Sequence, residues 1–194
     1  MAISDFTVAV VCSSNMNRSM EAHAFLRKKG FNVRSFGTGD KVKLPGTAWN
    51  KPNIYDFGCS YDDIYRDLYN KNQTFYTRNG LLNMLDRNRR IKQHPERFQQ
   101  CNEQFTVVIT CEERVYNQVL EHFETIQNIG NKPVYVININ IQDNQEEATF
   151  GSFLIYEFVN LLSRSEDLDN AIEQLVIKYQ EKCHKSLLNC VFFF

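Results

Sequence analysis

Long apolar runs are absent from this sequence of 194 residues. No hydrophobic stretch approaches the about 18 residues that a membrane-spanning helix needs, so we expect no transmembrane segment. The first residues, MAISDFTVAVVC, have no basic segment ahead of their short apolar run, which excludes a typical secretory signal. The sequence therefore predicts a protein that is neither held in a membrane nor exported.

An excess of charge of either sign is also absent. The 22 basic and 23 acidic residues nearly cancel, so nothing indicates a general surface for nucleic acid or acidic membranes. The four histidines are scattered and no two cysteines form a C-x-x-C pair, so we expect no zinc site, and no other cofactor is indicated. Six cysteines without a secretory signal predict free thiols in a reducing compartment.

Apolar and aromatic residues, by contrast, are plentiful enough for a folded core. Hydrophobic residues make up 43% of the chain and aromatic residues 13%, which is typical of globular proteins and not of disordered chains. The length suits one domain, and neither an internal repeat nor a low-complexity linker divides the chain. We therefore predict a single domain that covers residues 1–194.

Strand-like and helix-like segments alternate along the chain, which is typical of an α/β fold. A buried strand is predicted at Thr7–Cys12, and further strands at Asn32–Gly37, Phe105–Thr110 and Val134–Ile139. Helices are predicted at Ser19–Lys29, Tyr61–Asn70, Arg78–Leu85, Glu112–Phe123, Glu146–Leu162 and Asp167–Lys182. We expect a mainly parallel sheet with helices on both faces, which is a three-layer αβα arrangement. The last segment, LLNCVFFF, is too apolar to lie free in solvent, so it is expected to form a fifth strand or to pack against the core.

Two further segments are interpreted as surface connections. Residues Thr38–Asn53 hold two of the four prolines and are predicted to form a loop. Residues Asp86–Lys92, with the sequence DRNRRIK, are predicted to be a basic turn or helix end on the solvated surface.

The connection between the first strand and the first helix carries the strongest chemical signal. The strand ends at Cys12, and the helix begins near Ser19 after Arg18. Backbone N–H groups ahead of a helix form a natural anion site, and an arginine adds a planar fork of donors that matches phosphate oxygens. The predicted phosphate cradle consists of Ser13, Ser14, Asn15, Met16, Asn17, Arg18 and Ser19.

The C-x5-R spacing of Cys12 and Arg18 fits attack on phosphorus by sulfur. The donors of the cradle would also stabilise a thiolate, which is the nucleophilic form of cysteine. The bare pattern is weak because composition alone produces it often, and a buried cysteine can simply be a small apolar side chain. Its position between a strand and a helix favours the interpretation as a phosphate-binding catalytic loop.

Phosphoryl transfer to a thiolate needs an acid that protonates the leaving oxygen. Asp143 follows the fourth strand and therefore lies at the same edge of the sheet as Cys12. Asp143 could equally cap the next helix, because Asp-Asn ahead of QEEA is good capping chemistry. The residues alone leave both roles open.

Six segments spread over the chain closely resemble the Ssu-type phosphatases of the RNA polymerase II C-terminal domain. They are VCSSNMNRSMEAH, SFGTGDKVKLPG, NGLLNMLDRNRRIK, PERFQ, TCEERVY and IQDNQEEATFG. The resemblance implies a fold like that of the low-molecular-weight tyrosine phosphatases, with sheet order 2-1-3-4-5. It implies a nuclear, metal-independent cysteine phosphatase that acts in transcription termination and mRNA 3′-end processing. The implied substrate is phosphoserine before proline, at the fifth and possibly the seventh heptad position, and the implied partner is a symplekin-type scaffold.

The resemblance also assigns roles to individual residues. It makes Cys12 the nucleophile, Arg18 the phosphate clamp and Asp143 the general acid, with Ser19 supporting the thiolate. Two positions depart from the family pattern. Many members have aspartate at position 140, where this chain has Asn140, and a lost carboxylate could change how Asp143 acts. Glutamine can occupy position 16 in other members, but we expect little effect from Met16.

A substrate-binding role is predicted for Lys43, Leu44 and Pro45 in the segment KVKLPG. This segment follows the second strand, so in a 2-1-3 order it should border the Cys12 loop. Lys43 could attract an acidic peptide, while Leu44 and Pro45 could wall a slot for the substrate proline. The alternative is an ordinary turn in which Pro-Gly serves backbone geometry.

Three rival functions are compatible with parts of the sequence. A low-molecular-weight tyrosine phosphatase shares the loop but presents its acid as Asp-Pro, a dipeptide that this chain lacks. An arsenate reductase needs resolving thiols, for which Cys183 and Cys190 have a suitable spacing, although both lie at the end of the chain. A phosphopeptide-binding scaffold would result if Asn140 has disabled the acid.

Overall fold

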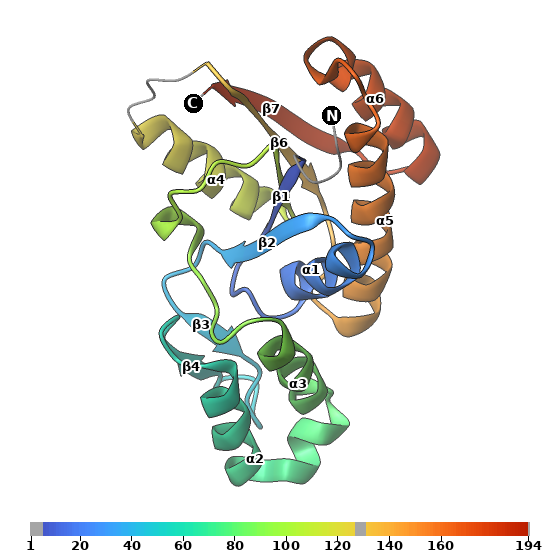
Figure 1. Cartoon of the computed structure of the whole chain (residues 1–194). Coiled ribbons are helices and arrows are strands. Elements are labelled where there is room, and N and C mark those ends of the chain that lie inside the picture. The colour runs from blue at the N-terminus through green and yellow to red at the C-terminus, as the bar shows by residue number, and fades with distance from the viewer. Residues whose placement is uncertain (1–5, 127–130, 194) are drawn as a thin grey trace.

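A computed structural model describes residues 6–126 and 131–193. Its main sheet has five strands in the order β2-β1-β5-β6-β7 (Figure 1). The strands are β1 (Thr7–Cys12), β2 (Asn32–Gly37), β5 (Val107–Thr110), β6 (Pro133–Ile139) and β7 (Leu187–Phe193). The first four are parallel to their neighbours, and β7 is antiparallel to β6. Counted within this sheet alone, the order is 2-1-3-4-5, which confirms the prediction.

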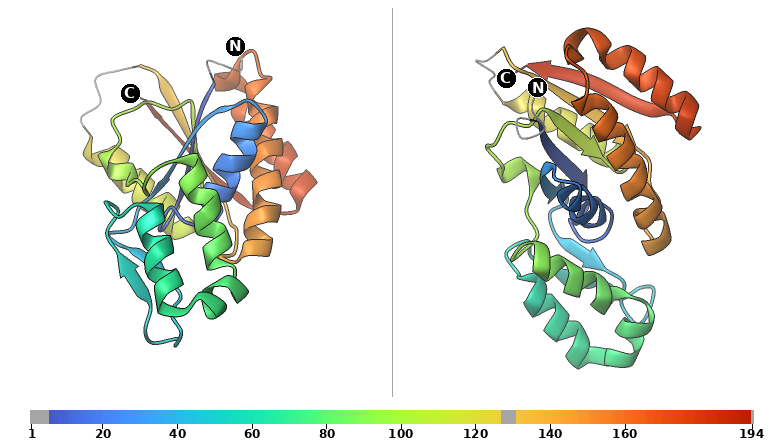
Figure 2. Two further views of the ribbon diagram at one scale, coloured as in Figure 1. Left: turned by 60° about the horizontal axis from the view of Figure 1, so that its bottom comes forward. Right: turned by 45° about the vertical axis from the view of Figure 1, so that its right-hand side comes forward.

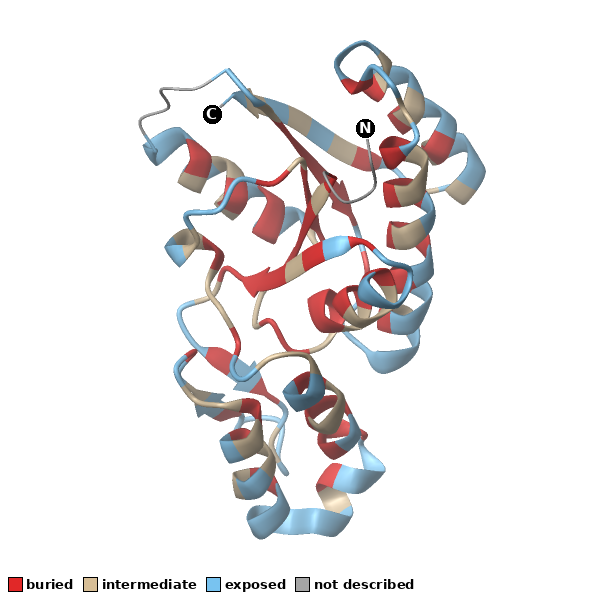
Figure 3. Ribbon diagram, in the orientation of Figure 1, coloured by how far each residue is buried: buried red, intermediate tan, exposed pale blue. Residues whose placement is uncertain are grey.

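The central strands are apolar because both faces of the sheet are covered. Val8, Val10 and Cys12 pack on the face that carries α1 (Arg18–Lys28), α5 (Gln145–Ser163) and α6 (Leu168–Cys183). Ala9 and Val11 pack on the opposite face, against α4 (Glu113–Thr125) and the short 3-10 helix η2 (Phe98–Gln100). Figure 3 shows the buried interior of the sheet between these helices. The three-layer prediction is therefore confirmed.

The C-terminal segment forms β7, the edge strand beyond β6. Its side chains alternate: Leu188, Cys190 and Phe192 pack against the cluster on the α4 side, while Val191 and Phe193 are exposed. The predicted fifth strand is thus present, and Phe194 lies outside the described residues.

The prediction of a plain loop at Thr38–Asn53 is wrong. Two short strands, β3 (Val42–Leu44) and β4 (Asn53–Tyr55), pair as an antiparallel ribbon within this region. Each strand has only three residues and borders proline-containing turns, so no two-residue periodicity is long enough to be recognised. Val42 and Leu44 are buried against the helices that follow.

Helices α2 (Tyr61–Arg78) and α3 (Leu81–Ile91) end well beyond their predicted ends, and α3 begins at Leu81 instead of the predicted Arg78. Only Asn72 interrupts α2, with non-helical backbone angles, so the predicted gap at residues 71–77 is wrong. Gly80, at φ 79°, separates the two helices, because this left-handed conformation suits glycine. With β3 and β4 they form a unit beside the end of the sheet where β1 stops, in the lower part of Figure 1 and in both views of Figure 2.

None of the helices in the described part of the chain is long and apolar enough to cross a membrane. The single-domain organisation of residues 1–194 stays a prediction.

Candidate active site

The loop between β1 and α1 brings the predicted nucleophile and its support together. Cys12 is buried at the end of β1, and its Sγ lies 3.0 Å from the Ser19 hydroxyl oxygen. The Ser19 oxygen accepts a hydrogen bond from Asn15 Nδ2 at 3.0 Å. Since that bond occupies a lone pair, the Ser19 proton is free to point at the sulfur. A proton donated from Ser19 to the sulfur is the hydrogen bond that a nucleophilic thiolate would need.

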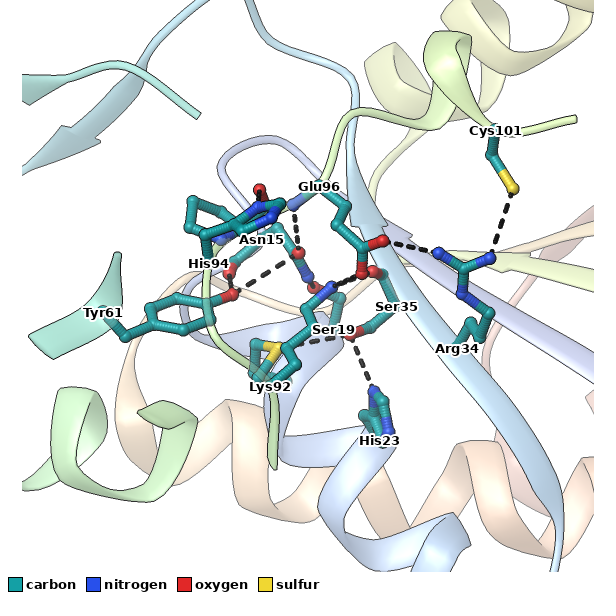
Figure 4. A network of polar contacts seen from close by, with 12 residues as sticks. Asn15, Ser19, His23, Arg34, Ser35, Tyr61, Lys92, His94, Glu96 and Cys101 are labelled. Carbon is teal, nitrogen blue, oxygen red and sulfur yellow. Dashed lines mark hydrogen bonds and ion pairs between the residues drawn. The ribbon is translucent and has the colours of Figure 1, made fainter. Parts of the chain in front are cut away.

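Asn15 has a left-handed backbone conformation, with φ 53°, and is held from two sides. The Tyr61 hydroxyl donates to the Asn15 carbonyl oxygen at 2.7 Å, and the Glu96 backbone N–H donates to Asn15 Oδ1 at 3.0 Å (Figure 4). Gly37 makes room beside it, because a Cβ there would lie 2.7 Å from the Ser13 carbonyl oxygen. The unusual conformation of the loop is therefore fixed by residues from three other segments.

Arg18 is buried at the start of α1 and anchored at one end of its guanidinium. Its Nη1 donates to the Ile141 carbonyl oxygen at 3.0 Å, and its Nη2 lies 2.7 Å from Glu112 and 3.5 Å from Asp143. Burial lowers the pKa of Arg18, but the charges of Cys12 and the nearby acids outweigh it, so the pKa is raised and the side chain stays cationic. Arg18 Nε is buried and has no partner among the described residues, which leaves a donor suited to a phosphate oxygen.

Asp143 stands over the same loop without capping α5. Its Oδ1 accepts a hydrogen bond from Asn17 Nδ2 at 3.0 Å, and its side chain is 60% exposed. Asn144 is the residue that caps α5, because its side-chain oxygen accepts from the Glu147 N–H at 2.8 Å. The capping interpretation of Asp143 is therefore wrong, and its carboxylate is available at the loop.

One cavity of about 230 Å³ connects these groups with the predicted substrate-binding residues. Cys12 and Asp143 line it, and so do Lys43, Leu44 and Pro45. The α2–α3 unit supplies a further wall that the sequence did not predict, formed by Asn79, Leu81 and Met84. Met16 also lines the cavity, but its side chain is almost fully buried in the cluster of α2 and α3.

A family model described as "Ssu72-like protein" matches residues 6–194. The chain belongs to the Ssu72 family. It is 53% identical to the human SSU72, a phosphatase of the RNA polymerase II C-terminal domain, over the whole length of both chains. It is 56% identical to the zebrafish protein of that name, over 96% of each chain. The chain also resembles a solved structure of D. melanogaster Ssu72 with Symplekin, which is bound to a cis peptidomimetic of the C-terminal domain with phosphoserine at the fifth position. The two chains are 54% identical, with a TM-score of 0.95, and the match covers 98% of this chain and 100% of that chain.

Two residues of α3 hold the loop of this Ssu72-family chain and were missed in the sequence. Asn88 is fully buried and donates to the Met16 carbonyl oxygen at 2.8 Å. Arg87 donates to the same oxygen at 2.9 Å and pairs with Glu21 of α1. The predicted solvated surface at Asp86–Lys92 is thus wrong for these two. Leu81, Leu85 and Asn88 share one helical face, and that spacing could have indicated the burial of Asn88.

Glu112, the N-cap residue of α4, is another residue that the sequence did not single out. Its carboxylate pairs with Arg18 at 2.7 Å and with Arg114 at 2.8 Å, and Arg114 donates to the Ser13 hydroxyl at 3.1 Å. Glu112 therefore links the phosphate clamp to the outer side of the cradle. The segment TCEERVY carried this information, but only the fold shows which side chains meet.

Asn140 and the C-terminal cysteines, Cys183 and Cys190, have surroundings that bear on the rival functions. Asn140 Oδ1 accepts a hydrogen bond from Asn138 Nδ2 at 2.9 Å, and among the described residues its side chain makes no hydrogen bond to Asp143. Cys183 ends α6, and Cys190 lies in β7, three strands from β1. At about 4.8 Å per strand, a resolving thiol in β7 is too distant to reach Cys12.

Proposed function

We propose that this protein is a cysteine-dependent phosphatase that removes phosphate from phosphoserine before proline in the heptads of the RNA polymerase II C-terminal domain. One observation carries the proposal: Cys12, Arg18 and Asp143, predicted as nucleophile, clamp and acid, lie together around one loop. The names of the Ssu72 relatives support the substrate class.

In the first step, the Cys12 sulfur attacks phosphorus while the bond from phosphorus to the serine oxygen breaks. Backbone N–H groups of the cradle and the Arg18 guanidinium bind the equatorial oxygens, whose charge must be stabilised in the transition state. Protonated Asp143 gives its proton to the departing serine oxygen. The products are the peptide with an unmodified serine hydroxyl and a phosphocysteine at position 12.

In the second step, water attacks the phosphocysteine and Asp143 accepts the proton that the water loses. The bond from phosphorus to sulfur breaks, and the electron pair returns to Cys12 as a thiolate. The Ser19 hydroxyl, 3.0 Å from the sulfur, stabilises that leaving group. Phosphate then departs, and the enzyme has recovered its starting protonation state.

The cavity wall of Leu44 and Pro45 accommodates a substrate proline, and we infer that the cis isomer is the one bound. The fly structure with a cis peptidomimetic that carries the fifth-position phosphoserine supports this choice. Lys43, exposed at the rim, attracts the phosphorylated chain. Fifth-position phosphoserine is the proposed principal substrate, and seventh-position phosphoserine is a second one to test.

The proposal also gives the protein a place in the cell. Its substrate, the RNA polymerase II tail, locates it in the nucleus, where it acts in transcription termination and mRNA processing. A symplekin-type scaffold is the proposed partner, since Symplekin accompanies the fly relative.

A two-phase time course tests the substrate assignment. A cis X-Pro bond is populated at only about 10–30% in free peptides and exchanges over tens to hundreds of seconds. Excess enzyme should therefore consume a phosphoserine-proline peptide in a fast minor burst and a slow phase. A prolyl isomerase should accelerate the slow phase and leave aryl phosphate turnover unchanged. One fast phase to completion would exclude cis selection, and tight peptide binding without turnover would favour the scaffold function.

A further inference from the structure

A second, larger cavity lies on the other side of the phosphate loop. Its volume is about 700 Å³, and Ser14 and Lys43 line both this cavity and the one that contains Cys12. Ser13, Gly39 and Arg97 also line it. A peptide chain bound at Cys12 can therefore continue into it across Ser14 and Lys43. We call it the Arg97 cavity.

The Arg97 cavity is lined by more positive than negative charge. Four cationic side chains come from three separate parts of the chain, and two carboxylates oppose them. The cations are Lys41, Lys43, Arg97 and Arg114, and the carboxylates are Asp40 and Glu121. Burial lowers the pKa of His122, another lining residue, so this ring stays neutral near pH 7. The balance favours an anionic ligand.

Two of the carboxylates paired with these cations are largely exposed. Arg97 pairs at 3.0 Å with Asp40, whose side chain is 93% exposed. Lys41 pairs with Asp56, whose side chain is 70% exposed. Exposed ion pairs contribute little to stability, so a doubly charged phosphoryl group can replace these carboxylates at little cost.

Unpartnered polar atoms in the wall match a phosphopeptide in particular. Arg97 Nε is buried and donates to no group of residues 6–126 or 131–193. Gln99 Oε1 is likewise buried without a donor from the described residues. Both side chains line the cavity, so a small side-chain movement would let a phosphoryl oxygen accept from the first atom and a peptide N–H donate to the second, whereas free phosphate would supply mainly acceptors.

We propose that the Arg97 cavity binds a second phosphoryl group, carried by the same peptide chain whose phosphoserine is bound at Cys12. The inference rests on the proposed function for the identity of the peptide, but it concerns binding and not catalysis. It makes the protein a reader of multiply phosphorylated heptads. Because two sites on one chain act together, affinity rises without any new contact at Cys12.

Calorimetric titration of the Cys12→Ser protein tests the proposal without turnover. The ligands are two-heptad peptides with phosphoserine-proline in one heptad, or with a second phosphoserine at increasing distance from the first. The doubly phosphorylated peptide of suitable spacing should bind about tenfold more tightly at low salt, and the gain should shrink as salt rises. Two equivalent binding registers alone would give only about a twofold gain, so the larger effect is required.

Variants at the far side of the cavity locate the second phosphate. Arg97→Gln should reduce the ratio of the affinity for the doubly phosphorylated peptide to that for the singly phosphorylated peptide toward about two. Lys41→Gln, at an exposed position, should do the same independently, and in both variants the singly phosphorylated peptide should bind as before. Arg66→Gln is the matched control, because Arg66 lies on α2 and lines neither cavity. Aryl phosphate turnover of the unmodified enzyme is measured in parallel.

The outcomes separate the two proposals. A ratio near two in the parent protein, or one that both cavity variants leave unchanged, overturns the second phosphate site. Binding of inorganic phosphate at Arg97 without any preference for the doubly phosphorylated peptide overturns it as well. Absence of aryl phosphate turnover contradicts the proposed enzymatic function and leaves the titration ratio as an independent result.

Discussion

The two loops that build the candidate site are held in very different ways. The loop after β1 receives hydrogen bonds from α2, α3 and the backbone at Glu96, and its key residues are buried. The loop after β6 is anchored at Ile141, whose carbonyl accepts from Arg18. Its Asp143 is largely exposed and accepts a hydrogen bond from Asn17 at 3.0 Å and a longer one from Arg18 at 3.5 Å. A preorganised cradle suits the stabilisation of a fixed charge, whereas an acid must change its proton and its partner during each cycle. We therefore expect mutations that remove a support of the first loop to affect both stability and rate, and mutations of the acid to affect rate alone.

Cys12→Ser should produce the largest effect in the molecule. A serine hydroxyl is far less nucleophilic than a thiolate at neutral pH, so aryl phosphate hydrolysis should fall to background, by more than about 10⁴-fold. The melting temperature should change little, because the substitution keeps the shape of a buried side chain. Cys190→Ser in β7 is the control and should keep full activity. Substantial turnover by the Cys12 variant would reject the phosphocysteine mechanism.

Asp143→Asn should lower the rate on a phosphoserine peptide by about 10²–10⁴-fold, the usual contribution of a general acid or base. The loss should be smaller on an activated aryl phosphate, whose leaving oxygen needs little protonation. Denaturant unfolding should show unchanged stability, because Asp143 is exposed and caps no helix. Glu146→Gln, in the first turn of α5, is a matched control for charge. Equal losses on both substrates would assign Asp143 a structural role.

The sequence predicts the features that depend on nearby residues. The bounds of β1 and β2 match the prediction, and β1 has the continuous apolar sequence expected of a parallel strand buried on both faces. The link between Cys12 and Arg18 is equally local. Asn88, by contrast, meets Met16 across 72 positions, and only tertiary packing brings them together. The capping role of Asp143 stayed open for a related reason, since Asp143 and Asn144 are both good caps and only the fold selects one of them.

Low pH should destabilise the folded protein through His23. This residue of α1 is buried, with Nδ1 2.8 Å from the Ser35 hydroxyl oxygen, and burial together with the charge of Lys92 lowers its pKa from 6.5 to about 4 (Figure 4). Below pH 6.5 the unfolded chain binds a proton that the folded protein does not, so stability falls as the pH drops from 6.5 to about 4. The loss should reach about 3 kcal/mol. Urea unfolding at a series of pH values should show that His23→Gln removes this part of the pH dependence. If the unfolding free energy of the variant still falls between pH 6.5 and 4 as in the parent protein, His23 is not its cause.

Asn88→Ala tests whether the cradle is held from α3. The substitution leaves the Met16 carbonyl with Arg87 alone and opens a small void at a fully buried position. An unfolding free energy lower by about 1–3 kcal/mol is expected, together with a reduced kcat on both substrates. Arg90→Ala, at an exposed position of the same helix, should change neither quantity. If Asn88→Ala lowers kcat without lowering stability, the contrast between the two loops is wrong.

Asn140→Asp should have the smallest effect on the rate, and the direction of the change tests whether position 140 influences Asp143. The new carboxylate would still accept the hydrogen bond from Asn138, so no rearrangement is required. Its charge would repel the Asp143 carboxylate and favour the protonated form that donates to the leaving oxygen. No hydrogen bond joins residues 140 and 143 among the described residues, so the new charge acts through solvent, where two unit charges about 10 Å apart interact by about 0.4 kcal/mol, or about twofold. We therefore expect about a twofold gain on the phosphoserine peptide, no change on an activated aryl phosphate, and loss of the gain at high salt. A gain of tenfold or more would mean that position 140 acts on Asp143 through a direct contact, and that the second loop is as tightly organised as the first.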